Sequence, residues 1–188
     1  MYPDLKPPDP PLSDGVIMLR PPDPERDSPT LPAFSFDSEI VRRLLGGEPP
    51  LPDPDEVFSR QLDWWRRGTN AFFSIDAVGH DHRVGAVRVL FGLYDPFGFA
   101  EIGYLLLPDG RGHGYASRAV RLVARWVFDD LGIGRLQART HVDNVASQRV
   151  LERTGFQREG VARRGHILPV SGERIDTLMW SLLPGELR

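Results

Sequence analysis

The 188-residue sequence contains no cysteine. Disulfides, cysteine nucleophiles and thiolate metal ligands are therefore excluded, which fits a reducing, cytoplasmic location. The chain also lacks an apolar run approaching the ~20 residues that a membrane span needs. Its first residues, 1–8, lack the apolar core of a secretory signal peptide. We therefore expect a cytoplasmic protein with no membrane partner.

Lysine is almost missing, because Lys6 is the only one and all other basic residues are arginine. The net charge is −3, and no basic cluster with interleaved aromatic residues is present. We therefore expect no nucleic-acid partner. The scarcity of lysine also removes the Lys-Ser/Thr pair that a Walker phosphate-binding loop requires.

Proline, by contrast, is frequent at the start of the chain, where five of the first eleven residues are prolines. This composition predicts an extended arm over 1–13, followed by a single domain over 14–188. Residue patterns predict strands over 16–19, 71–78, 83–91, 101–107, 135–141, 160–168 and 174–182. They predict helices over 37–45, 55–67, 115–131 and 145–153. Strand pairs on either side of a strand–helix–strand centre predict an α+β fold with a mixed sheet.

A glycine-rich turn joins the predicted strand 101–107 to the predicted helix 115–131, and it reads Arg-Gly-His-Gly-Tyr-Ala over 111–116. Backbone N–H groups at the start of a helix bind anions, so the turn suits a phosphate or pyrophosphate. A tight turn without a ligand is the alternative. A dinucleotide fingerprint would need glycine where Ser117 stands, which excludes that site.

At these residues the chain resembles the GNAT acetyltransferase superfamily. Its acetyl-CoA motif, Arg/Gln-x-x-Gly-x-Gly/Ala, matches Arg111, Gly114 and Ala116. A second segment of the family is matched over 144–156, which begins at Asn144. That segment is similar to the RimJ/RimL branch, which acetylates the N-termini of ribosomal proteins. The Glu-Ile-Gly-Tyr sequence at 101–104 also fits the branch, and the resemblance covers roughly residues 14–184.

The resemblance implies a GNAT fold, with a mixed and mostly antiparallel central sheet and helices on both faces. It implies acetyl-CoA as cosubstrate and no metal. The implied coenzyme-binding residues are Leu105, Leu106, Leu107, Arg111, Gly112, His113, Gly114, Tyr115, Ala116 and Asn144. The leucine backbone would pair with the pantetheine arm, the turn would hold the pyrophosphate, and Asn144 would bond a pantetheine amide. Helix capping is the alternative role of Asn144.

The same resemblance implies direct attack of an amine on the thioester. Glu101 matches a general-base position, although a strand-end carboxylate that contacts solvent or an arginine is the alternative. Many GNAT enzymes carry an acidic tyrosine where this chain has Leu151. Ser147 is the alternative of the branch, and it would hydrogen-bond the leaving thiolate or relay a proton from water. A serine of the first helical turn with no such role is the other interpretation.

The implied acceptor is a protein N-terminal α-amine. A small amine, such as an antibiotic, polyamine or amino-acid derivative, is the alternative, and a CoA-binding regulatory module is a third. Trp64, His166 and Asp176 are the candidate substrate-binding residues, with packing as the alternative for Trp64. The late hairpin and the tryptophans could also support a homodimer. His80 and His82 form a possible metal pair, but no third ligand is evident from the sequence.

Overall fold

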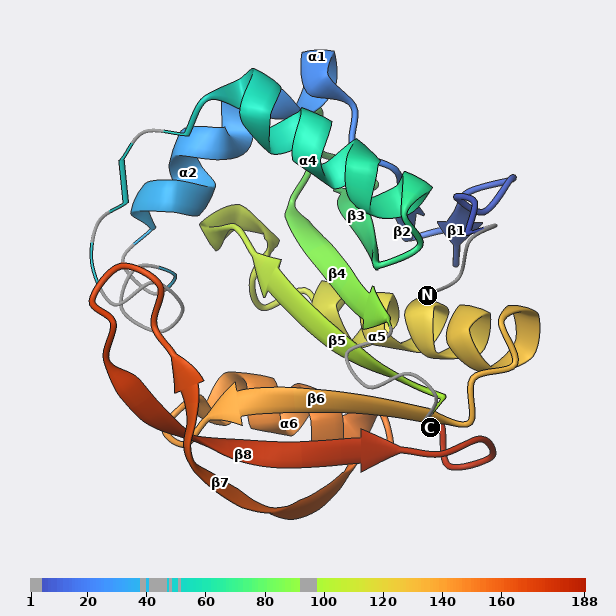
Figure 1. Cartoon of the computed structure of the whole chain (residues 1–188). Helices are drawn as coiled ribbons and strands as arrows, with labels where there is room; N and C mark the ends of the chain where they lie inside the picture. The colour runs from blue at the N-terminus through green and yellow to red at the C-terminus, as the bar shows by residue number, and fades with distance from the viewer. Residues whose placement is uncertain (1–4, 38–39, 41–46, 48, 51, 92–97) are drawn as a thin grey trace.

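One sheet organises the protein (Figure 1). The computed structural model describes residues 5–37, 40, 47, 49–50, 52–91 and 98–188. Its strands are β1 (Leu12–Ser13), β2 (Ile17–Arg20), β3 (Asn70–Ala77), β4 (Gly85–Phe91), β5 (Phe99–Leu106), β6 (Arg135–His141), β7 (Gln157–Ile167) and β8 (Arg174–Leu182). They lie in the order β1-β2-β3-β4-β5-β6-β8-β7, and the pair β5 and β6 is parallel while the other pairs are antiparallel. The predicted mixed, mostly antiparallel sheet is confirmed.

Helices cover both faces of this sheet. They are α1 (Pro24–Asp27), α2 (Leu31–Phe36), α4 (Pro54–Arg66), α5 (Tyr115–Arg125) and α6 (Val145–Arg153), with short 3₁₀ turns η1 (Ser28–Thr30) and η3 (Pro108–Gly110). Side chains of adjacent residues in a strand point to opposite faces of the sheet, so neighbouring residues contact helices on different faces. On β3, Ser74 donates a hydrogen bond to Asp27 of α1 at 2.7 Å, whereas the ring of Phe73 meets Trp126, after α5, at 5.4 Å.

An aromatic cluster forms the centre of the core between α4, the sheet and the end of α5. The Trp65 ring lies 5.3 Å from that of Phe73 and 6.1 Å from that of Trp126, and Phe91 lies 6.0 Å from Trp126. Edge-to-face pairs of this kind add about 0.5–1.5 kcal/mol each to the burial of their surface. The cluster fixes α4 and α5 on the sheet, and α5 begins at the functional site described below.

A buried ionic network holds the first helices on the other face. Asp27 is fully buried and accepts hydrogen bonds from two nitrogens of Arg20, at 2.7 and 3.0 Å. Arg20 also bonds Asp76 at 2.8 Å, and the Arg83 guanidinium donates to the Asp27 carbonyl at 3.2 Å. Burial alone would raise the pKa of Asp27, but its hydrogen bonds and the nearby guanidinium groups outweigh burial and lower it. The network therefore keeps Asp27 ionised.

A predicted helix and the predicted arm differ in detail from the structure. The helix expected over 115–131 is α-helical only to Arg125, and its last turn, Trp126–Asp130, is a π-helix (η4) in which the Leu131 N–H bonds the Trp126 carbonyl. The helix expected over 37–45 lies almost wholly outside the described residues. Within the predicted proline-rich arm, Leu12 and Ser13 pair with β2.

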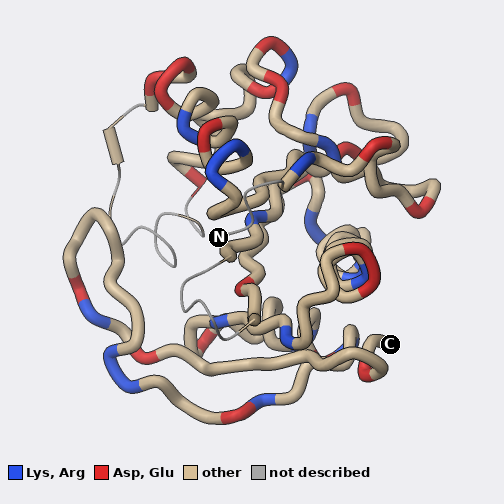
Figure 2. Tube along the Cα trace, turned by 45° about the vertical axis from the view of Figure 1, so that its right-hand side comes forward, with Lys and Arg blue, Asp and Glu red and all other residues tan. Residues whose placement is uncertain are grey.

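The described residues contain no helix that is long and apolar enough to cross a bilayer. Charged residues of both signs alternate over the helices above the sheet and along the β7–β8 hairpin (Figure 2). On these elements, positions of the two signs are therefore interspersed along the chain.

Candidate active site

Two neighbouring strands separate in the middle of the sheet. The parallel pairs of β5 and β6 run from Phe99↔Arg135 to Ile102↔Ala138. Beyond them β5 continues to Leu106 and β6 to His141, and the strands diverge into an open V (Figure 1). On its other side β5 stays paired with β4 through Leu106↔Gly85. The edge of β5 that faces the V can therefore bond an extended ligand.

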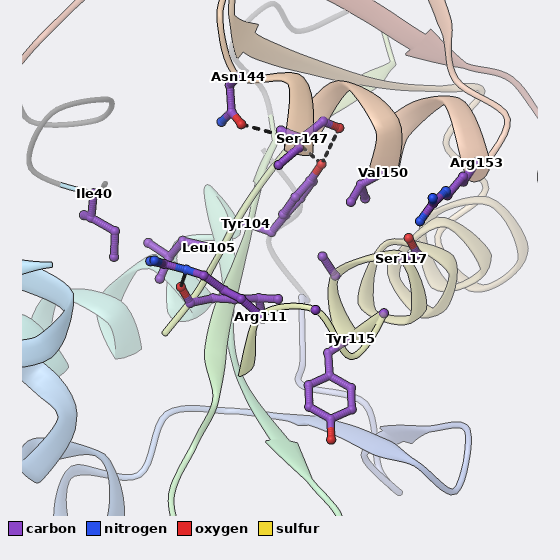
Figure 3. A pocket seen from close by; sticks show the side chains of 15 residues that line it. Ile40, Tyr104, Leu105, Arg111, Tyr115, Ser117, Asn144, Ser147, Val150 and Arg153 are labelled. Carbon is purple, nitrogen blue, oxygen red and sulfur yellow. Dashed lines mark hydrogen bonds between the residues drawn. The ribbon is translucent and has the colours of Figure 1, made fainter. Parts of the chain in front are cut away.

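A cavity of about 440 Å³ lies beside this opening (Figure 3). It is bounded by the end of β5, the glycine-rich turn and the facing helix α6. Its lining residues are Ile40, Tyr104, Leu105, Leu106, Arg111, Gly112, Gly114, Tyr115, Ala116, Ser117, Asn144, Ala146, Ser147, Val150 and Arg153. Most of the predicted coenzyme residues are therefore gathered around one cavity, which draws its walls from three separate segments.

The glycine-rich turn presents the start of α5 to the cavity. Gly114 is the N-cap residue of α5, with φ 76°, and it provides no side chain to cap the helix. A Cβ atom at Gly112 or Gly114 would meet no protein atom within 4 Å, so space for a ligand lies beside the turn. The N–H groups of Tyr115 and Ala116 are free of a side-chain cap, and Arg153 adds positive charge to the same cavity. These residues fit an anionic phosphate group.

Asn144 and Ser147 face the cavity from the start of α6. The Asn144 side chain accepts a hydrogen bond from the Ser147 N–H at 3.2 Å, so it caps the helix. Both residues also line the cavity, and the capping role therefore coexists with a position suited to contact a ligand. Ser147 points its hydroxyl toward β5, where it meets a tyrosine.

That tyrosine, Tyr104, was not among the predicted site residues. Its hydroxyl lies 2.8 Å from the Ser147 Oγ, where either oxygen can be the donor, and 3.2 Å from the Ser147 carbonyl, which is the other acceptor within reach of its single proton (Figure 3). Burial raises the pKa of Tyr104, and the hydrogen bond with Ser147 only partly opposes this. Tyr104 is therefore a protonated donor at neutral pH. The Glu-Ile-Gly-Tyr sequence was the available signal, but its contact with a residue 43 positions away required the fold.

Glu101 lies on the opposite face of β5, where it belongs to a cluster of charged residues. Its Oε2 accepts a hydrogen bond from Gln137 at 2.9 Å and lies 3.1 Å from the Arg139 Nε. Burial lowers the pKa of Arg88, and the charge of Glu101 opposes this effect. Burial also lowers the pKa of His166, with a further contribution from Arg139, while Glu101 acts in the other direction. The cluster therefore combines a carboxylate with an imidazole that is neutral at pH 7.

The other predicted substrate residues, Trp64 and Asp176, have different surroundings. The Trp64 ring lies 6.0 Å from the Arg88 guanidinium and 5.7 Å from that of Arg60. Trp64 is thereby joined to the charged cluster through Arg88. The Asp176 carboxylate instead accepts a hydrogen bond from the Arg164 N–H at 2.7 Å. Arg164 has φ 50°, so Asp176 holds an irregular part of β7 in place.

Two predicted coenzyme residues do not line the cavity. Leu107 is buried, and its N–H donates to the Val84 carbonyl at 2.9 Å. His113 stacks on Tyr115 with ring centroids 5.3 Å apart. The Tyr115 ring points away from the cavity (Figure 3), so the backbone of Tyr115 and not its ring faces the ligand space. His113 therefore packs on the buried Tyr115 ring outside the cavity.

A family model for the acetyltransferase (GNAT) domain matches residues 17–157. The chain belongs to the GNAT acetyltransferase family. This match covers both strands of the V, the glycine-rich turn and α6, which are the elements that build the cavity. The predicted GNAT fold is thus confirmed.

The chain is also similar to several N-acetyltransferases and solved structures. It is 38% identical over 84 residues to the uncharacterised N-acetyltransferase YoaA of Bacillus subtilis, covering 45% of this chain and 46% of the relative. Mycobacterium smegmatis RimJ in complex with CoA-disulfide is 22% identical, with a TM-score of 0.77 over 92% of this chain and 84% of that one. The ribosomal-protein-S5-alanine acetyltransferase of Vibrio fischeri is 19% identical, with a TM-score of 0.77 over 94% and 97%. The chain spans about half the length of the curated relatives it matches first.

Proposed function

We propose that this protein transfers an acetyl group from acetyl-CoA to the α-amine of a protein N-terminus. The observation that carries the proposal is the position of β5 between two unlike sites. One face holds a cavity with a free strand edge and an uncapped helix start, and the other holds the carboxylate and imidazole of Glu101 and His166. This arrangement supports a coenzyme on one side and an acceptor on the other. Acetyl-CoA would supply an activated thioester.

The coenzyme side fits an extended thiol ester with a phosphate group at its far end. Pantetheine amides would bond the open edge of β5, where the Arg111 Nε already donates to the Leu106 carbonyl at 3.1 Å. The N–H groups at the start of α5 would bind the pyrophosphate. A backbone N–H of β5 directed at the thioester oxygen would stabilise the charge that develops during attack, a contribution of about 3–4 kcal/mol in comparable sites.

The acceptor side must provide a neutral amine. A free α-amine titrates near ~8 and a lysine near ~10.4, so most of either carries a proton at pH 7. Glu101 would accept that proton, directly or through a water, as the amine nitrogen attacks the thioester carbon. Its hydrogen bond from Gln137 and its contact with Arg139 hold the carboxylate in position for this step. His166, whose pKa is lowered, could share the proton.

The leaving group is handled on the coenzyme side. As the new C–N bond forms, the C–S bond breaks and the sulfur leaves as a thiolate, which then takes one proton that originates from water. Ser147 would donate a hydrogen bond to that sulfur while Tyr104 donates to the Ser147 oxygen, so the pair forms a two-membered relay. This pair takes the place of the tyrosine that many GNAT enzymes carry where this chain has Leu151.

The choice of acceptor is tested with the full chain and acetyl-CoA. Release of the free CoA thiol is measured with three kinds of acceptor. The first is a set of peptides with a free N-terminus, and the second is a set of peptides whose N-terminus is blocked and which carry an internal lysine. The third is a set of polyamines. We expect release with the free N-terminal peptides, and mass spectrometry should place the acetyl group on the α-amine. Release with polyamines alone would contradict the proposed acceptor. Acetyl-CoA binding with no release for any amine would instead support a CoA-binding module.

The relay is tested with Tyr104→Phe, Ser147→Ala and the double variant. Losing one hydrogen bond to a charged group costs about 1.5–3 kcal/mol, so each single variant should lower kcat about 10- to 150-fold with little change in acetyl-CoA affinity. If the two hydroxyls act as one relay, the double variant should be no slower than Ser147→Ala. Additive losses, or losses in affinity equal to those in kcat, would contradict the relay.

A further inference from the structure

Two histidines and a carboxylate meet on the surface next to the glycine-rich turn, outside the proposed active site. His80 and His82 lie in the turn between β3 and β4, and Asp109 lies in η3 after β5. The His82 Nε2 is 2.6 Å from the Asp109 Oδ2, and the His80 Nδ1 is 3.7 Å from the same oxygen. One ligand atom from each residue lies within 4.8 Å of the other two. From these three side chains we infer a binding site for a transition-metal ion, with Zn²⁺ as the best match.

The donor atoms are those that zinc prefers. Zinc in proteins takes imidazole nitrogens and carboxylate oxygens at about 2.0–2.2 Å, which places tetrahedral ligand atoms about 3.3–3.5 Å apart. On metal binding, the distance of 2.6 Å between His82 Nε2 and Asp109 Oδ2 would have to lengthen, and the distance of 3.7 Å between His80 Nδ1 and Asp109 Oδ2 would have to shorten. Small rotations of the exposed side chains are enough for both changes. Asp109 and His82 are both partly exposed, at 43% and 45%, so such an adjustment disturbs no packing. Water would complete the tetrahedron.

Aromatic contacts support the arrangement of the two rings. The His80 ring meets that of His82 at 6.0 Å and that of Tyr115 at 6.1 Å, both nearly perpendicular. Tyr115 in turn stacks on His113. His80 is held at 21% exposure in this setting, so one of the three ligands is already oriented. A preoriented ligand lowers the entropic cost of binding.

The position of the site gives it a structural consequence. His80 and His82 belong to the β3–β4 turn, whereas Asp109 precedes the glycine-rich turn by two residues. A bound ion would link these two segments, which are 27 positions apart at His82 and Asp109. The inference does not rest on the proposed acetyltransferase activity, because it uses only the ligand set.

The site is tested by titrating Zn²⁺ into the full chain, prepared without a histidine tag, by calorimetry. Co²⁺ serves as a second probe, since its visible absorption reports tetrahedral coordination. We expect one ion per chain. In other zinc sites, removing a residue that only hydrogen-bonds a zinc ligand weakens metal binding about 10- to 100-fold. His82→Ala and Asp109→Asn each remove a ligand itself, so each should weaken Zn²⁺ binding by at least that factor. Zn²⁺ should also raise the Tm of the wild type and not that of His82→Ala.

The matched control is His141→Ala. His141 forms a similar pair with Asp143, with the nitrogen and oxygen 2.5 Å apart, but it is not part of the three-residue cluster. This variant should bind Zn²⁺ as the wild type does. The inference is overturned if the wild type binds no tighter than His82→Ala, or if His141→Ala loses as much affinity as His82→Ala. Circular dichroism verifies that each variant is folded, and the exposed position of His82 makes that the expected result.

Discussion

A methyl group added at Gly114 should weaken acetyl-CoA binding by more than its effect on stability explains. Gly114 has φ 76° and caps α5, and an added Cβ would meet no protein atom within 4 Å. The methyl group of Gly114→Ala would therefore occupy only the space where we place the pyrophosphate. It would keep the anion away from the N–H groups of Tyr115 and Ala116. Losing one hydrogen bond to a charged group costs about 1.5–3 kcal/mol, which is a loss of about 10- to 150-fold in acetyl-CoA affinity.

Gly114→Ala also strains the backbone. The control is therefore a substitution that causes the same strain away from the proposed coenzyme site. An L-residue in the left-handed region costs roughly 1–2 kcal/mol. Gly132, at the other end of the same helical segment, has φ 65° and equally open surroundings. Gly132→Ala should thus lower stability as much as Gly114→Ala. Because 1 kcal/mol corresponds to about 2–4 °C for a chain of this size, both variants should melt about 2–8 °C lower.

The assay combines calorimetric titration of acetyl-CoA with thermal melts of the three proteins. The expected result is an equal loss of Tm in both variants and a loss of affinity in Gly114→Ala alone. Wild-type affinity in Gly114→Ala would refute the placement of the pyrophosphate at this turn. An equal loss of affinity in Gly132→Ala would show that strain, and not the blocked N–H groups, is responsible.

Two further substitutions probe the opposite face. Asp27→Asn should lower the free energy of unfolding by about 3–5 kcal/mol near neutral pH, because it leaves Arg83 buried without its carboxylate partner and leaves Arg20 with Asp76 alone. The folded pKa of Asp27 is lowered, so its contribution is present above the ordinary value of 3.8 and is lost as the pH falls below it. Denaturant melts at neutral and acidic pH should show the difference shrinking, and a loss under 1 kcal/mol at neutral pH would contradict the network. Glu101→Gln keeps the acceptor for Gln137 but removes the base. The variant should lower kcat/KM about 100-fold or more, most at acidic pH where less amine is neutral, and an unchanged pH–rate profile would exclude Glu101 from proton transfer.

Local patterns were sufficient to predict the elements with clear boundaries. The strand over 135–141 and the helix over 145–153 have the bounds that the sequence predicts, because Asn144 marks the helix start by capping it. The π-helical turn at Trp126–Asp130 was missed, and it begins at Trp126, which contacts aromatic rings far away in the chain. The division into an arm over 1–13 and a domain over 14–188 stays a prediction.

Both the glycine-rich turn and its anion-binding character were predictable from the order of residues over 111–116, because a helix start and a bare backbone are local properties. Only the tertiary structure decided which side chains face that turn. Tyr104 meets Ser147 across the open V, while Glu101 is turned to the opposite face because strand residues alternate. Asp109 likewise joins His80 and His82 only when the sheet brings two turns together. Contacts of this kind depend on strand pairing over long separations, which no short stretch of sequence encodes.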